Sequence, residues 1–218
     1  MRRGTTRNEA KFGSAGRRTR SSRTSTLESI QVRPSILIVC EGEKTEPNYF
    51  RAFRITNAVY GEGLETIRVV EEAQRINDQD GPFDQVWCVF DRDSFPPDHF
   101  DNAINKVNSL TDKGFRVAYS NEAFELWYIL HFEYQDAALS RSSYGGRLSA
   151  HLRREYRKGD IEIYGLLQTM GDESLAIRYA QRLRAHHEVG LPHSLRNPET
   201  TVDILVQVLR NVQRQRGY

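Results

Sequence analysis

The stretch ILIVCEGE, residues 36–43, places five consecutive apolar residues directly ahead of Glu41 and Gly42. A short, continuously apolar run rich in β-branched residues is typical of a strand buried on both faces, as in a parallel sheet. Gly42 allows the backbone to turn sharply after such a strand. We therefore expect a buried parallel strand over 36–40 that presents Glu41 at its carboxyl end.

A second run of this kind, QVWCVF at 85–90, ends at Asp91-Arg92-Asp93. Strands are also expected at 66–70 and at 115–119, where Ser120 and Asn121 follow the strand. Helical patterns separate the strands, running from Pro47 into Val59, from Asp98 to about Leu110 and from Ser120 through Glu133. Residues 71–78 read as a short helix or loop. The span 70–83 then looks short for a full helical crossover, which leaves the strand order open.

Strands that alternate with helices imply an α/β fold with a mostly parallel sheet flanked by helices. Residues 34–134 are expected to form this core. Residues 135–218 read as a helical portion packed on the core, with a loop at 142–146 and helices at 147–157, 174–187 and 201–214. Active sites in such folds lie just beyond the carboxyl ends of the strands, which is where the polar groups named above emerge.

The N-terminal residues 1–28 are rich in Arg, Ser, Thr and Gly and poor in large apolar residues. Such a segment cannot repay the entropy of ordering, so we expect a disordered basic arm. Residues 1–26 carry a net charge of +7, which leaves −5 on the remainder of a chain whose net charge is +2. The arm is suited to contact nucleic-acid phosphates or an acidic partner surface, and a merely solvated tail fits equally well.

Composition narrows the class of protein further. The hydrophobic fraction is 38% and the mean hydropathy is −0.64. No apolar run approaches the ~20 residues that span a bilayer, and no apolar segment follows the basic N-terminus as in a secretory signal. Cys40 and Cys88 both lie inside apolar runs, as reduced core thiols do. These features predict a cytoplasmic protein without a membrane partner.

The acidic residues that follow the strands carry the chemistry. Alternate residues of an extended segment project to the same side, so Asp91 and Asp93 together offer hard oxygen ligands for Mg²⁺ or Mn²⁺. Glu41 would emerge beside them if the two strands are neighbours, and could complete a metal site or act as a general acid/base. Acidic residues also cap many strands and turns without any catalytic role, so neither motif is decisive alone.

Three strings together resemble the RloB-like family, which is classed with the Toprim nucleases: IVCEGEKTEP at 38–47, WCVFDRD at 87–93 and SNEAFELW at 120–127. The resemblance spans about 34–131 and extends more faintly to the Asn-Pro-x-Thr segment at 197–200. One departure is Glu122-Ala123, where relatives tend to have Pro-Cys. The resemblance implies a Toprim-like Rossmannoid fold, and proteins of this family are encoded near bacterial restriction and abortive-infection systems.

By this resemblance, Glu41 is expected to be the general acid/base, with Asp91 and Asp93 as ligands of Mg²⁺ or Mn²⁺. Glu125, one turn into the next helix, is a further candidate ligand, although an exposed helix carboxylate is the alternative. Lys44 is a candidate for contact with a phosphate or with developing negative charge, and an exposed lysine without a role fits as well. Glu43 and Glu46 read as supporting acids near a helix N-terminus. His131, Trp87 and Trp127 read as core residues.

The helical half offers a basic group with tyrosines nearby, which could track a nucleic-acid backbone, although a solvated helix face is the commoner outcome. The candidate nucleic-acid-binding residues are Arg147, Arg153, Arg154 and Arg157. The sequence contains no P-loop, no dinucleotide-binding glycine motif and no zinc-ligand spacing. Any nucleotide-driven step would therefore come from a partner, and the resemblance to defence loci suggests an ATPase from the same locus.

The leading hypothesis is a metal-dependent nuclease that acts on DNA or RNA within an anti-phage system. A non-catalytic nucleic-acid-binding or regulatory subunit is the first alternative, and a nucleotidyl or phosphoryl transferase on the same site is the second. The sequence leaves the substrate, the activating trigger and homo-oligomerisation open.

Overall fold

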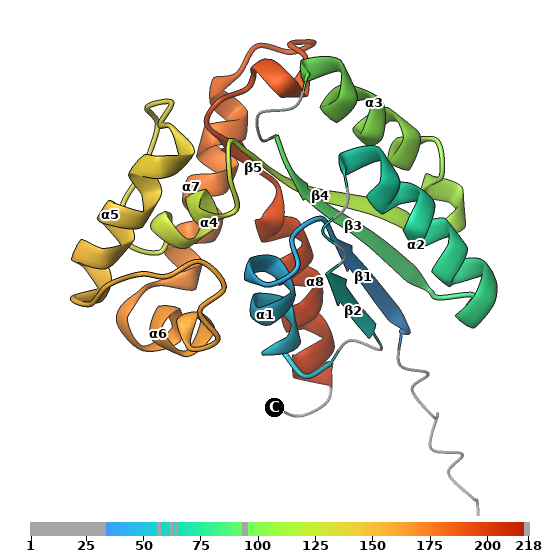
Figure 1. The fold of residues 1–218 in the computed structure, drawn as a ribbon, viewed down its shortest axis with the longest axis horizontal. Helices are drawn as coiled ribbons and strands as arrows, with labels where there is room; N and C mark the ends of the chain where they lie inside the picture. Colours follow the sequence, from blue (N-terminus) through green and yellow to red (C-terminus); the bar gives the residue numbers. More distant parts are fainter. Residues whose placement is uncertain (1–33, 56–57, 62, 64, 93–95, 216–218) are drawn as a thin grey trace, which may run out of the picture. The chain divides into compact units, whose positions relative to one another are not determined.

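The computed structural model describes residues 34–55, 58–61, 63, 65–92 and 96–215. The predicted arm, residues 1–28, and the predicted ligand Asp93 lie outside these ranges. Within them, one sheet has the strand order β2-β1-β3-β4-β5, in which β1 to β4 are parallel and β5 is antiparallel to β4 (Figure 1). The predicted α/β fold with a mostly parallel sheet is confirmed. The strands are β1 Ile36–Cys40, β2 Ala58–Gly61, β3 Gln85–Asp91, β4 Phe115–Asn121 and β5 Glu199–Thr200.

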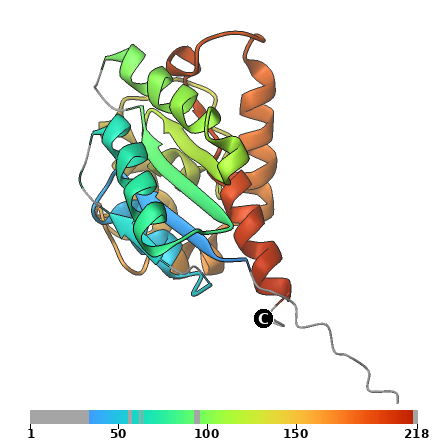
Figure 2. The ribbon, with the colours of Figure 1, turned by 90° about the vertical axis from the view of Figure 1, so that its right-hand side faces the viewer.

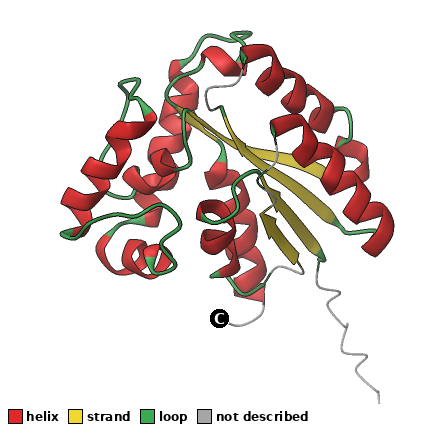
Figure 3. Ribbon diagram, viewed as in Figure 1, coloured by secondary structure: helices red, strands yellow, loops and turns green. Residues whose placement is uncertain are grey.

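Helices alternate with the first four strands and then dominate the C-terminal half of the described chain (Figure 3). None of the helices in the described ranges is long and apolar enough to cross a membrane. The α-helices are α1 Thr45–Arg51, α2 Thr66–Asp80, α3 Pro97–Asn108, α4 Glu125–Ile129, α5 Arg141–Leu152, α6 Ile163–Met170, α7 Glu173–His186 and α8 Val202–Gln215, with 3₁₀ turns at Thr111–Lys113 and His193–Leu195.

Successive side chains of β1 point to opposite faces of the sheet, so the apolar core is divided between the two faces. Leu37 and Val39 pack with the apolar residues of α2 and α3, two helices that lie side by side over one face (Figure 2). Ile36, Ile38 and Cys40 pack on the opposite face, against residues from α1 and from α4 to α8. Both faces are therefore covered, which explains why β1 is a continuous apolar run.

The register brings the carboxyl ends of the central strands together. Cys40 of β1 pairs with Val89 of β3, and the N–H of Glu41 donates to the carbonyl of Val89 at 2.9 Å. Asp91 of β3 in turn pairs with Ser120 of β4. Residues that follow or end these strands consequently share one edge of the sheet.

The strand predicted at 66–70 is wrong, because these residues form the first turns of α2. The buried residues of α2 recur at helical spacing, namely Thr66, Val69, Val70, Ala73 and Ile76. The β-branched run favoured a strand locally, and the helical period emerges only over the full fifteen residues. The second strand is instead the half-buried edge strand β2, and α2 is the complete crossover that the span 70–83 seemed too short to hold.

Three other predicted boundaries are also wrong. The first helix ends at Arg51, well before Val59. The helix expected over 120–133 is the short α4, because β4 continues to Asn121. The loop expected at 142–146 lies inside α5, so the helix expected at 147–157 begins earlier than predicted and ends at Leu152. The helix α6 was not predicted.

The C-terminal portion is mainly helical, as expected, and it also returns to the sheet. Thr201 donates its N–H to the carbonyl of Tyr119, and its hydroxyl accepts the N–H of the same tyrosine, both at 2.9 Å. α8 then carries Leu205, Val206 and Leu209 into the core on the α1 face. Residues beyond 134 thus complete the α/β core.

Candidate active site

The two acidic motifs meet through a hydrogen bond. Glu41 Oε2 accepts the backbone N–H of Asp91 at 2.9 Å, and Glu41 Oε1 accepts the hydroxyl of Thr66 at 3.2 Å. Thr66 begins α2, in the residues 66–70 that were predicted to form a strand, so this crossover helix also fixes the carboxylate. The structure therefore holds Glu41 in one orientation between the ends of β1 and β3.

Asp91 lies at the centre of the edge. Its Oδ2 accepts the N–H of Phe124 at 3.0 Å and lies 3.8 Å from the guanidinium of Arg141. Its Oδ1 is buried and has no hydrogen-bond partner within the described part of the chain. Arg141, at the start of α5, is the arginine that approaches the acids, and sequence reasoning did not single it out.

Two further carboxylates, Glu46 and Glu125, join Glu41 and Asp91. Glu46 lies in the first turn of α1, and the hydroxyl of Tyr156 donates to Glu125 Oε1 at 3.1 Å. Glu46 Oε2 and Glu125 Oε2 are both buried without a hydrogen-bond partner among the described residues. All four acids are nearly inaccessible, with 2% (Asp91), 3% (Glu46), 6% (Glu125) and 8% (Glu41) of their surface exposed.

Burial and repulsion between the carboxylates favour the protonated forms of Glu41, Asp91 and Glu46. Burial raises the pKa of Glu41 from 4.5 to about 7, although the hydrogen bonds from Asp91 and Thr66 oppose the rise. Burial also raises the pKa of Asp91 well above its usual value, and the charges of Glu46, Glu125 and Glu41 add to this. For Glu46, burial and then the charge of Glu125 act in the same direction. A bound cation would relieve this repulsion.

The donor chemistry fits Mg²⁺ or Mn²⁺, because these ions prefer carboxylate oxygens and three buried carboxylate oxygens of this group lack a partner among the described residues. As the side chains stand in the described ranges, no three acidic, histidine or cysteine residues form a ready metal-binding group. Loading an ion would therefore require the carboxylates to rearrange, or a ligand from outside these ranges such as Asp93. Asp91, Glu125 and Glu46 are the described residues that would hold it.

The predicted basic residues have different surroundings. Arg147 pairs with Glu133 at 2.8 Å, Arg154 pairs with Asp160, and Arg157 pairs with Glu155 at 2.8 Å. Their charges are therefore partly compensated within the chain. Arg153 is the exposed residue that follows α5, with a left-handed φ of 52°. Lys44 is exposed and lines a recess that also contains Glu46. The binding role of these residues stays a prediction.

The residues predicted to be core are core. His131 is buried against Trp127, and burial lowers its pKa to about 4. Trp87 is buried as well, and both cysteines are buried free thiols.

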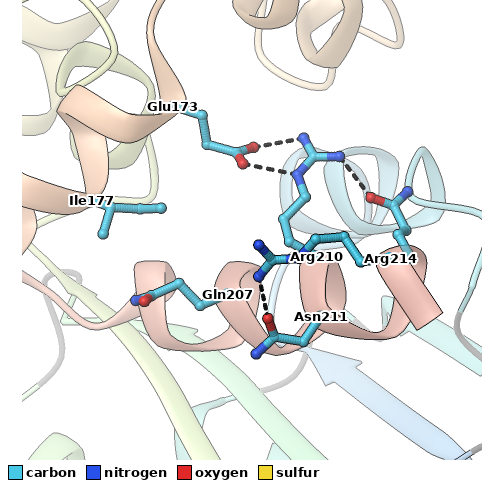
Figure 4. Close-up of a pocket in the computed structure, with 7 residues that line it drawn as sticks. Glu173, Ile177, Gln207, Arg210, Asn211 and Arg214 are labelled. Atoms are coloured by element: carbon cyan, nitrogen blue, oxygen red, sulfur yellow. Dashed lines mark hydrogen bonds and ion pairs between the residues drawn. The ribbon is translucent and has the colours of Figure 1, made fainter. Parts of the chain in front are cut away.

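A separate hollow of about 620 Å³ lies between α7 and α8, away from these acids. Its Arg210 makes two hydrogen bonds to Glu173, at 2.8 and 2.6 Å, and Arg214 bonds Asn211 (Figure 4). Arg210 also lies over the Phe53 ring. The hollow therefore presents an arginine that already has partners, and it offers no reactive group.

Comparison with known proteins gives one family. A family model described as RloB-like protein matches residues 36–209, a range that includes all four buried acids, Lys44 and the four predicted arginines. No match to a curated protein or to a solved structure was found.

Proposed function

The chain belongs to the RloB-like protein family, and from that premise we propose that it is a metal-dependent nuclease that acts on nucleic-acid phosphodiesters through a Toprim-like site. The observation that carries the proposal is the convergence of four nearly buried carboxylates where the central parallel strands end. A group of buried carboxylates that repel one another is costly to stability, and such clusters are typical of functional sites.

Glu41 is the general acid/base in this proposal. Two hydrogen bonds hold its carboxylate, and burial raises its pKa in the metal-free protein to about 7, a range that suits proton transfer near neutral pH. Such a group can take the proton of an attacking water or protonate a leaving oxygen.

Asp91 and Glu125 hold the metal ion, joined by Glu46, which sequence reasoning had given only a supporting role. Asp93 keeps its predicted part as a ligand. When bound, Mg²⁺ or Mn²⁺ would neutralise charge on the phosphoryl oxygens and activate water. Arg141, beside Asp91, supplies positive charge for the developing anion, and Lys44 keeps its predicted contact with a phosphate of the substrate.

A nucleic-acid-binding or regulatory subunit is a second candidate. The observation that favours it is that the described side chains, as they stand, form no ready metal-binding group. The resemblance to defence loci supports an anti-phage role for either candidate, with an ATPase from the same locus as partner. The two buried free thiols favour the reducing cytoplasm.

The test is cleavage of plasmid, single-stranded DNA and tRNA with Mg²⁺ or Mn²⁺. Wild type is compared with Asp91→Asn, which keeps the shape of the side chain, and with Asp112→Asn, an exposed aspartate at the opposite end of the sheet. Cleavage by wild type and Asp112→Asn but not by Asp91→Asn supports the nuclease. If wild type cuts no substrate with either metal, even with the neighbouring ATPase supplied, the binding subunit is preferred; nucleotide incorporation would select a transferase.

A further inference from the structure

A recess of about 370 Å³ lies beside Glu46, one of the four buried acids. Its lining comes from the loop that follows β1 and from a turn in the segment between α5 and α6, namely Gly42, Glu43, Lys44, Thr45, Glu46 and Lys158. Glu46 belongs both to this lining and to the buried acidic group. The recess therefore leads from the surface to Glu46, one member of the acidic group.

The rim of the recess is held in place. The side-chain amide of Asn48, in α1, donates to the carbonyl of Gly159 at 2.9 Å. Gly159 has a φ of +80°, and a Cβ at this position would lie 2.9 Å from Lys44 Cβ. The turn at 158–159 is thus packed against the side chain of Lys44, which sets Lys44 and Lys158 on the same rim.

These two lysines differ from the predicted basic residues in their charge environment. Both are exposed, and neither forms an ion pair with any described residue. Arg154 and Arg157, in the same α5–α6 segment, are paired with acids. Lys158 lies within electrostatic range of Glu46 in the same recess. Positive charge that is not held in an ion pair is available to a phosphate group.

The depth of the acids limits the form of the substrate. A phosphodiester in an intact duplex lies on the outside of a stiff rod, and it cannot reach carboxylates that are more than nine-tenths buried. A single strand is flexible, and one of its nucleotides can enter while the neighbouring phosphates stay at the rim.

We propose that Lys44 and Lys158 form a phosphate-binding site at the mouth of this recess, and that it receives single-stranded nucleic acid. The site would hold a phosphate next to the one that reacts. This inference rests on the proposed function for the identity of its ligand, and it is tested by binding in the absence of cleavage.

The experiment measures equilibrium binding of labelled single-stranded DNA, single-stranded RNA and the matching duplex by fluorescence anisotropy in EDTA, over a range of salt. The full chain is used, so that the basic N-terminal residues contribute equally to every variant. Lys158→Ala and Lys44→Ala are compared with Lys158→Arg, which keeps the charge. Lys106→Ala, an exposed lysine near the far end of α3, is the matched control.

Each alanine variant at the rim is expected to weaken single-strand binding roughly fivefold to tenfold at low salt. The slope of the logarithm of the binding constant against the logarithm of the salt concentration should become shallower by ~0.7. Lys158→Arg and Lys106→Ala keep the wild-type slope, and duplex binding changes in none of the variants. A difference in affinity between single-stranded DNA and single-stranded RNA shows which of the two sugars the site prefers.

Unchanged single-strand binding by both alanine variants would overturn the phosphate site. An equal loss on the duplex would overturn the choice of single strands. If the alanine variants weaken single-strand binding but no substrate is cleaved, the nuclease proposal is contradicted. The phosphate site is then still supported, since it binds strands without cleavage.

Discussion

Glu41 accepts the backbone N–H of Asp91 through Oε2, at 2.9 Å, so the carboxylate that ends one strand is fastened to the main chain of the next. The two residues are fifty positions apart and meet because β1 and β3 are parallel neighbours in the sheet. The bond uses the main chain of Asp91 and neither of its carboxylate oxygens, so that Oδ2 accepts the N–H of Phe124 and Oδ1 has no partner among the described residues. It fixes the proposed acid/base beside the proposed metal ligand, and the carboxylate of that ligand takes no part in the bond.

Glu41→Gln is expected to reduce cleavage by ~10²–10⁴-fold, the usual contribution of a general acid/base. The amide can still accept the N–H of Asp91 through its oxygen, so the fold should persist. Initial rates with Mg²⁺ measure the effect. Glu71→Gln, an exposed glutamate on α2, is the control. A Glu41→Gln rate within threefold of wild type would remove Glu41 from the chemistry.

The stability of the metal-free protein should depend on the charge of Glu41. Its folded pKa of about 7 is higher than the ordinary 4.5, so its favourable contribution is present below pH 4.5 and is lost as the pH rises through 7. Glu41→Gln should therefore become more stable relative to wild type between pH 5.5 and 8, approaching a gain of roughly 2–3 kcal/mol. Urea unfolding in EDTA measures this, and a pH-independent difference would contradict it.

Binding of Mn²⁺ should offset the loss of stability that the charge of Glu41 causes at high pH. An ion that binds only the folded protein raises its stability, by ~2.7 kcal/mol at a hundred times Kd. For a chain of this size the expected rise in Tm is roughly 5–10 °C at pH 8. Glu125→Gln should reduce the rise, whereas Glu71→Gln should retain it. Equal shifts in the two variants would mean that the ion binds elsewhere.

The hydroxyl of Tyr156 is expected to restrain Glu125. Removal of this hydroxyl in Tyr156→Phe leaves Glu125 without its described hydrogen-bond partner, but free to turn towards a metal ion. We expect a loss of ~1 kcal/mol in metal-free stability, together with an Mn²⁺ affinity equal to or higher than that of wild type. Calorimetric titration provides the measurement, with Tyr179→Phe as the control. A large fall in Mn²⁺ affinity would instead make Tyr156 a support of the site.

Some of this site was predictable from local sequence, and some was not. Glu41 and Asp91 each follow a continuously apolar strand, and the geometry of a parallel sheet brings such ends together. Glu46 reaches the same point only because α1 begins at Thr45, directly after the turn, and a carboxylate at a helix N-terminus has many ordinary uses.

Arg141 and Tyr156 come from α5 and from the segment after it, whose position depends on packing between distant parts of the chain. α5 has Gly145 and Gly146 in its interior, which favoured a loop in the sequence analysis. Its burial of Tyr144, Leu148 and Leu152 overrides that propensity. The local preference of the two glycines for a loop is therefore why the start of α5, which places Arg141 beside Asp91, was not predicted.

Gly42 is expected to be required for the position of Glu46. A Cβ on Gly42 would lie 2.2 Å from Glu46 Oε2 and 2.8 Å from its carboxyl carbon, so Gly42→Ala must displace that carboxylate. We expect it to destabilise the protein by ~1–3 kcal/mol and to weaken Mn²⁺ binding. Gly146→Ala, where a Cβ meets nothing within 4 Å, should instead stabilise α5 by ~0.5–1 kcal/mol.

A double-mutant cycle isolates the cause. In a Glu46→Ala background the carboxylate is already absent, so adding Gly42→Ala should cost much less than it does in wild type. Urea unfolding of the four proteins measures the coupling. Because the φ of Gly42 lies outside the left-handed region, alanine is compatible with its backbone, and any remaining cost must come from packing. Full additivity of the two changes would show that Gly42 serves the turn itself and that the contact with Glu46 is incidental.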